Sequence, residues 1–161
     1  MAHKAKKDEP DGVKIICRNK RAFHEYEVFD TLECGLVLTG TEVKSLREGS
    51  ASLDGAYARI EDGELWLLSS DIPEYSMGNR LNHKPKRKRK LLLHRREIEK
   101  LDEASSQEGY TILPLEVYLK SGRIKVELGV CKGKKQYDKR QDQKRKDAAR
   151  EVEAALRRRD R

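Results

Sequence analysis

Residues 84–96 have the side chains best suited to binding chemistry in this sequence. They include eight Lys and Arg and no Asp or Glu, and we call them the basic segment. Several cations held by a folded domain, with no carboxylate among them, suit contact with the phosphates of a nucleic acid. The candidate phosphate-binding residues are Lys86, Arg87, Lys88, Arg89 and Lys90. A solvated loop, or a nuclear import signal in a eukaryote, is the alternative interpretation.

Residues 19–26, NKRAFHEY, form a second candidate site. RNA recognition combines cations for phosphates with amide and ring groups for bases and sugars. Asn19, Lys20, Arg21 and His24 fit this combination at the start of an expected strand. For Tyr26, a place in the core is the favoured interpretation.

Residues 133–140, GKKQYDKR, form the third candidate site. Gly133 allows close backbone approach to a ligand, and the aromatic ring of residue 137 is suited to stacking on a base. The neighbouring charges are suited to phosphates, with Asp138 orienting a cation or beginning a helix. The candidates here are Gly133, Lys134, Lys135, Tyr137, Asp138, Lys139 and Arg140.

Positive charge is segregated along the chain. The net charge is +8, yet outside residues 1–22, 84–96 and 132–161 the chain carries 8 basic and 19 acidic residues. Such segregation favours a polyanionic partner over a merely solubilising surface. Combinations such as His24 with Asp30, or His83 and His94 with Cys131, lack the spacing of a catalytic or metal site. We therefore expect no enzyme activity, cofactor or metal.

Three widely spaced cysteines favour a reducing compartment, and no apolar run suggests a signal peptide or a membrane span. We expect a cytoplasmic protein with no membrane partner. We also expect residues 1–12 to form a flexible tail, residues 13–132 one RNA-binding domain, and residues 133–161 a basic tail.

Short alternating runs predict a mainly β domain. Asp62-Gly63 and Ser121-Gly122 each lie between strand-like runs and predict hairpins. Residues 113, 115, 117 and 119 are expected on one face of a strand that is an edge or is bulged at Pro114. Residues 124, 126, 128 and 130 are expected on one face of its partner. Strands are also expected at residues 24–29 and 35–39.

Helices are predicted at residues 41–48, with Thr41 as the N-cap and Gly49 after the end, and at residues 94–106. Together these elements predict an OB-like closed antiparallel β-barrel of about six strands with two or three short flanking helices. Residues 138–161 have a narrow apolar stripe at helical spacing. We expect this tail to be disordered when free and helical when bound.

Four blocks of sequence carry a family resemblance. NKRAFHEYEV, LTGTEVKSLREGSASLDGAYARI, NHKPKRKRKLLLHRREI and GVCKGKKQYDKR occur in this order, and they resemble the signature blocks of the SmpB family. The resemblance implies an OB-like barrel that binds the tRNA-like domain of transfer-messenger RNA (tmRNA). It further implies one protein per tmRNA, a role in rescue of stalled ribosomes (trans-translation), and a tail that enters the decoding centre and the empty mRNA channel.

The resemblance also implies particular contact residues. The family's RNA-contact positions correspond to Glu33, Leu92 and His94, where some members have asparagine in place of His94. Lys44 lies in a block expected near the same face, and the decoding-centre motif corresponds to residues 138–140. Two alternatives stay open: a general OB-type single-stranded or ribosomal RNA-binding protein, and an RNA-processing enzyme.

Overall fold

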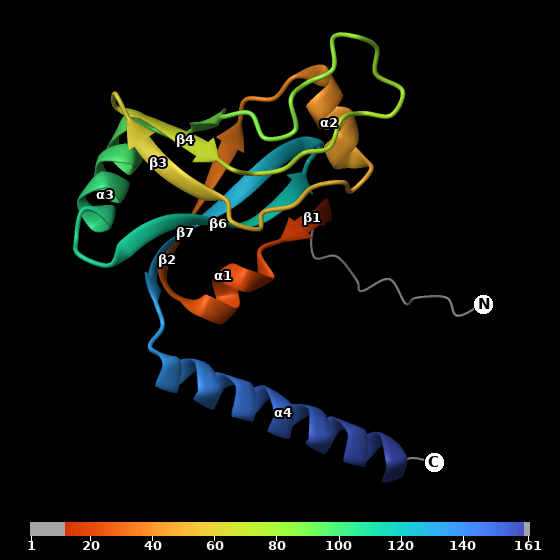
Figure 1. Ribbon diagram of the computed structural model, residues 1–161, viewed down its shortest axis with the longest axis vertical. Coiled ribbons are helices and arrows are strands. Elements are labelled where there is room, and N and C mark those ends of the chain that lie inside the picture. The colour runs from red at the N-terminus through yellow and green to blue at the C-terminus, as the bar shows by residue number, and fades with distance from the viewer. Residues whose placement is uncertain (1–11, 160–161) are drawn as a thin grey trace.

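The computed structural model describes residues 12–159, which form seven strands and four helices. The expected tail at residues 1–12 lies almost wholly outside this part of the chain. In chain order the elements are β1 (Val13–Arg18), α1 (Lys20–Glu25), β2 (Tyr26–Leu36), α2 (Gly40–Arg47), β3 (Tyr57–Glu61), β4 (Glu64–Leu68), β5 (Arg89–Leu92), α3 (Arg95–Ser105), β6 (Tyr110–Lys120), β7 (Arg123–Gly133) and α4 (Gln136–Arg159) (Figure 1).

The strands close on themselves. Antiparallel pairing runs β6-β3-β4-β5-β2-β7, and β7 then pairs with β6 again to complete a ring of six strands. β1 pairs with the second half of β6, beside the single β3–β6 pair at Ala58 and Ile112. Closure satisfies the hydrogen-bonding edges that a small open sheet would expose. The prediction of a mainly β, closed antiparallel fold of about six strands is confirmed.

Both predicted hairpin turns are present. Asp62 and Gly63 have φ of 51° and 72°, and Ser121 and Gly122 have φ of 50° and 76°. Positive φ at both central residues defines the turn type whose twist matches antiparallel strands. The two-residue connections thereby set the register of β3 with β4 and of β6 with β7.

A bulge at Pro114 divides the apolar residues of β6 between two clusters. The register of β6 against β7 shifts between Pro114 and Glu116. As a result Leu113 and Leu115 pack in a small cluster with Ala22 of α1, whereas Val117 packs in the main core. The bulge was predicted, but the expectation that residues 113, 115, 117 and 119 share one face is wrong, because the extra residue reverses the alternation.

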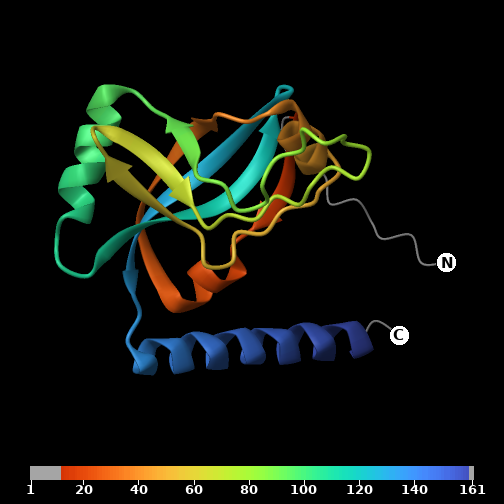
Figure 2. The ribbon, with the colours of Figure 1, turned by 45° about the horizontal axis from the view of Figure 1, so that its top comes forward.

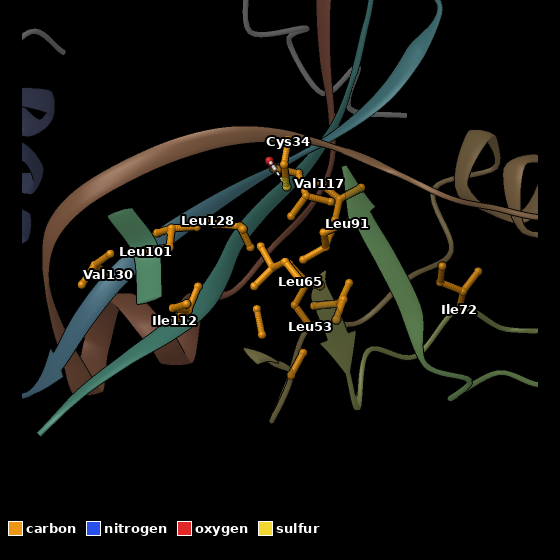
Figure 3. Packing of buried hydrophobic residues seen from close by; sticks show 14 of the residues in the cluster. Cys34, Leu53, Leu65, Ile72, Leu91, Leu101, Ile112, Val117, Leu128 and Val130 are labelled. Carbon is orange, nitrogen blue, oxygen red and sulfur yellow. Dashed lines mark hydrogen bonds between the residues drawn. The ribbon is translucent and has the colours of Figure 1, made fainter. Parts of the chain in front are cut away.

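The main core lies between the strands of the ring. All six ring strands contribute to it, together with Leu46 of α2 and Leu101 of α3 (Figure 3). On β7, Val126, Leu128 and Val130 are buried in this cluster and Ile124 packs against it, as predicted. This core makes the ring a rigid support for the groups on its outside.

Three local predictions need correction. Residues 20–25 form helix α1, whereas a strand was expected from His24, and β2 is one long strand in place of two short ones. Thr39, not Thr41, is the N-cap of α2. Asn19 explains α1: its side-chain oxygen accepts a hydrogen bond from Ala22 N at 3.0 Å, which caps the new helix. The helix at residues 94–106 and Gly49 with φ of 83° are as predicted.

A buried carboxylate connects α2 to the basic segment. Glu42 is fully buried and accepts hydrogen bonds from Arg87 Nε at 2.7 Å, Arg89 Nε at 2.8 Å and Thr39 N at 2.9 Å. Burial alone would raise the pKa of Glu42. The hydrogen bonds from Arg87 and Thr39 and the charge of Arg89 outweigh that effect and lower the pKa to about 2.

We predict that Glu42→Gln lowers the free energy of unfolding by about 3–5 kcal/mol, because Arg89 would keep its buried charge without a counter-charge. Urea unfolding at pH 7 measures this loss. Glu61→Gln, which removes a partly exposed carboxylate from the surface, is the control and should cost less than about 1 kcal/mol.

The stabilisation that Glu42 provides decreases as the pH falls. The folded pKa of Glu42 lies below its usual value of 4.5, so its stabilisation is complete above pH 4.5 and is lost as the pH falls toward about 2. Wild-type protein should therefore lose more stability than Glu42→Gln across this window. Equal losses in the two proteins would contradict the assignment.

Candidate nucleic-acid interface

The basic segment does not present all its cations to solvent. Arg89 has 0% exposure, and its guanidinium donates to Glu42, to the Ser70 carbonyl at 3.0 Å and to the Pro85 carbonyl at 2.9 Å. In this structure the Arg89 side chain is therefore not exposed for contact with a phosphate. Its position on β5 points the side chain inward, where it joins α2 to the chain before β5.

Carboxylates from other elements neutralise three more of the predicted cations. Arg87 pairs with Glu42, Lys88 with Glu61 of β3, and Lys90 with Glu64 of β4. The Lys88 ammonium also lies 4.4 Å from the centroid of the Trp66 ring, a cation–π contact. These pairings are tertiary, so the absence of acids within the segment itself did not reveal them.

Two exposed cations precede β5, Lys84 and Lys86, and within residues 12–159 neither makes an ion pair. At the other end of the basic segment, the arginines of residues 95–96 are exposed on α3. Lys44, on the neighbouring helix α2, is also exposed, and its ammonium lies 5.4 Å from the centroid of the Tyr75 ring. The cations available to a phosphate near the basic segment are therefore fewer than the sequence suggested, and they lie before β5, on α2 and at the start of α3.

The second candidate site lies on α1. Asn19 is buried and donates its amide to the Pro114 carbonyl at 3.0 Å, so it positions α1 and does not offer its side chain to a ligand. Lys20, Arg21 and His24 are exposed on the helix. Tyr26 packs against the small cluster beneath α1, as favoured from the sequence.

Glu33, Leu92 and His94 lie together, although they are far apart in sequence. They line one open pocket of about 320 Å³, with Gly35, Leu93, Glu97 and Lys125 among its other lining residues. The pairing of Gly35 with Leu92 in the β2–β5 ladder brings the two strands together here. Leu92 is 51% exposed, and a Cβ on Gly35 would lie 3.3 Å from the Leu92 Cβ. The pocket thus combines an apolar surface with an imidazole, two carboxylates and one ammonium group.

Hydrogen bonds from two neighbouring side chains fix the Glu33 carboxylate in place as an acceptor. It accepts from the Tyr118 hydroxyl and from Lys120 Nζ at 3.1 Å, and these contacts lower its pKa. An ionised carboxylate only accepts hydrogen bonds, so it suits the amino groups of bases and ribose hydroxyls and repels phosphate. His94 is exposed at the N-cap of α3, where its backbone N–H donates to the Glu97 carboxylate at 2.8 Å.

The third candidate site begins at the end of β7. Gly133 ends the strand, and the Lys134 backbone N–H donates to the Glu25 carbonyl at 2.9 Å. The Lys134 ammonium pairs with Asp142. Helix α4 then runs past α1 and lies apart from the ring (Figures 1 and 2). Lys135, Asp138 and Arg140 are exposed, Lys139 is half-buried, and Tyr137 lies in the first turn of α4.

Metal binding and thiol chemistry find little support in residues 12–159. No group of three His, Cys, Asp or Glu side chains there is arranged to hold a metal ion. Burial raises the pKa of Cys17 and Cys131 to about 11 and that of Cys34 to about 12, so these thiols are poor nucleophiles. None of the helices described is long and apolar enough to cross a membrane.

Glu42 is the important residue that the sequence argument missed. Its local signal was readable, because Thr39-Gly40-Thr41-Glu42 is a capping box, and Thr39 N does donate to Glu42. Nothing local showed that two arginines more than 40 residues away share the same carboxylate.

The closed β ring, the exposed cations and the open pocket define a small nucleic-acid-binding protein. Comparison with known proteins identifies the particular family. The model of the SmpB protein family matches residues 16–158, and this chain belongs to the SmpB family.

Relatives cover nearly the whole chain. The SsrA-binding protein of Thermobifida fusca is 55% identical over 99% of both chains. That of Geobacillus thermodenitrificans is 55% identical over 91% of this chain and 94% of its own. A solved structure described as "tmRNA-SmpB: a journey to the center of the bacterial ribosome" has 47% identity and a TM-score of 0.65, covering 74% of this chain and 85% of that one.

We predict that Lys84→Gln with Lys86→Gln weakens binding to folded RNA and reduces the slope of log affinity against log salt by about 1 for each cation that contacts a phosphate. Filter binding across a salt series measures both quantities. Lys88→Gln with Lys90→Gln is the matched control, because Glu61 and Glu64 already neutralise these lysines. A slope that changes more in the control pair would contradict this assignment.

Proposed function

We propose that this protein binds the tRNA-like domain of tmRNA and delivers it to stalled ribosomes for trans-translation. The observation that carries the proposal is the likeness to SsrA-binding proteins over nearly the whole chain. The likeness to a structure described as containing tmRNA and SmpB supports the same RNA, and its description names the bacterial ribosome. The pocket formed by Glu33, Leu92 and His94 supports recognition of folded RNA by base and ribose contacts.

The proposed RNA surface has three parts. Glu33, Leu92 and His94 contact bases and riboses, whereas exposed cations on α1, α2 and the chain before β5 contact phosphates. The phosphate contacts are Lys20, Arg21, Lys44, Lys84 and Lys86, with His24 beside them. Lys88 and Lys90 contribute only where RNA competes for their carboxylate partners. Asn19, Arg87 and Arg89 hold this surface in place.

The tail serves a different step. In the proposal, residues 133–140 enter the decoding centre and the rest of α4 occupies the empty mRNA channel, so that the protein stands in for a missing anticodon arm. A single copy acts on each tmRNA, in the cytoplasm where ribosomes translate, and the protein catalyses no reaction. Helix α4 is highly charged and exposes Val152 and Leu156. Such a helix gains little stability alone, so a partner is needed to order it.

We predict that the full-length protein prefers purified tmRNA to an equal mass of unrelated folded RNA, and that the preference persists at moderate salt. Leu92→Ala should weaken tmRNA binding by about tenfold, because a half-exposed leucine would lose apolar contact with a base. Ile15→Ala, at a similarly exposed apolar position on β1, is the control.

Equal binding to both RNAs that disappears with salt would overturn the proposal. That result would show a general RNA-binding protein whose affinity comes from phosphates alone.

We also predict that deletion of residues 138–161 leaves tmRNA affinity unchanged and abolishes tagging on stalled ribosomes in a reconstituted translation assay. The reason is that the pocket lies outside the deleted segment, as do the exposed cations on α1, α2 and the chain before β5. The deletion keeps the backbone bond from Lys134 to Glu25. Tagging at the wild-type level would show that the tail does not sense the vacant channel.

A further inference from the structure

The connection between β4 and β5 projects from the ring beside α2 (Figures 1 and 2). Its residues 75–86, which we call the loop tip, include Arg80, Lys84 and Lys86 and no Asp or Glu. All three cations are exposed, and none makes an ion pair within residues 12–159. The loop tip is therefore positively charged without internal neutralisation.

The loop tip is built by specific side-chain contacts. Asn82 donates its amide to the Tyr75 carbonyl at 2.8 Å and accepts from Tyr75 N at 3.2 Å, which closes the loop at its base. Gly78 lies inside this closure, because a Cβ there would lie 2.4 Å from the Asn82 amide nitrogen. Leu81 N also donates to the Asn79 side chain at 3.1 Å. These contacts give the tip a defined conformation.

A buried histidine fixes the loop tip to the fold. His83 is 6% exposed; its Nδ1 lies 2.8 Å from the Thr41 hydroxyl of α2, and its Nε2 lies 2.8 Å from the Ile72 carbonyl. The Ile72 N–H in turn donates to the Pro85 carbonyl at 3.0 Å. The tip is thus held against α2, the same helix that carries Lys44.

Two aliphatic side chains project from this fixed tip. Met77 is 85% exposed and Leu81 is 86% exposed, well above the next most exposed large hydrophobic residues, which are Val152 at 60% and Leu156 at 57%. Exposed aliphatic surface is unfavourable in water and stabilises a complex when a partner covers it. The surrounding positive charge favours a polyanion as that partner.

We propose that Met77 and Leu81 pack against the faces of unpaired bases in the RNA that this protein binds, while Arg80, Lys84, Lys86 and Lys44 hold the adjacent phosphates. Leucine and methionine side chains insert beside bases in nucleic-acid complexes, and base faces are apolar. This contact rests on the proposed function, and it shares no residue with the pocket formed by Glu33, Leu92 and His94. The RNA is therefore held at two separate places on the protein.

The test compares substitutions that alter only apolar contact. The double variant Met77→Ala with Leu81→Ala should bind purified tmRNA about tenfold more weakly at every salt concentration, with an unchanged salt slope. The double variant Met77→Leu with Leu81→Met should bind like wild type, because it keeps the apolar size. Ile15→Ala is the control for loss of an exposed aliphatic side chain elsewhere. Unchanged affinity in the double alanine variant would overturn the inference.

A second measurement locates the contact. A benzophenone amino acid in place of Met77 should crosslink to unpaired nucleotides of tmRNA, and crosslinks confined to paired nucleotides would overturn the inference. If wild-type protein binds tmRNA no better than unrelated RNA, the proposed function fails whatever the tip does. If wild-type binding is selective and the double alanine variant matches it, only the role of the tip fails.

Discussion

The ion-pair network of Glu42 fixes α2, the end of the β4–β5 loop and β5 relative to one another. This single carboxylate lies at the start of α2 and neutralises Arg87 and Arg89. Because α2, the loop between β4 and β5, and β5 all meet at this carboxylate, the position of each depends on the others. Leaving one of these charges unpaired in the interior would cost several kcal/mol. The network therefore ties the orientation of the exposed cations to the integrity of the fold.

The same principle divides the basic segment into two parts. The cations on and next to β5 meet carboxylates of α2, β3 and β4, whereas Lys84 and Lys86 have no such partner. Paired cations attract an incoming phosphate less, since their charge is already compensated and their carboxylates repel it. The middle of the segment therefore acts as scaffold, whereas Lys84 and Lys86 before it are left uncompensated.

The sequence predicted the features that depend on local chemistry. Positive-φ dipeptides set the two hairpins, and apolar periodicity located α3 and the inward face of β7. It could not predict α1, whose cap on Asn19 also requires the Pro114 carbonyl from β6. Nor could it predict the burial of Arg89, which depends on Glu42 across the fold. Family resemblance supplied the Glu33, Leu92 and His94 positions, and only the pairing of β2 with β5 explains why they share a pocket.

Few contacts connect the ring to the tail, so the free energy of folding the ring and the free energy of ordering the tail are separate. The Lys134 backbone bonds to Glu25, and its ammonium pairs with Asp142 in the second turn of α4. Beyond that turn the exposed Val152 and Leu156 gain nothing from the ring. The free energy of ordering the tail is therefore separate from that of the ring, which its buried core makes rigid. Contacts that order the tail can then form or break without rearranging the ring.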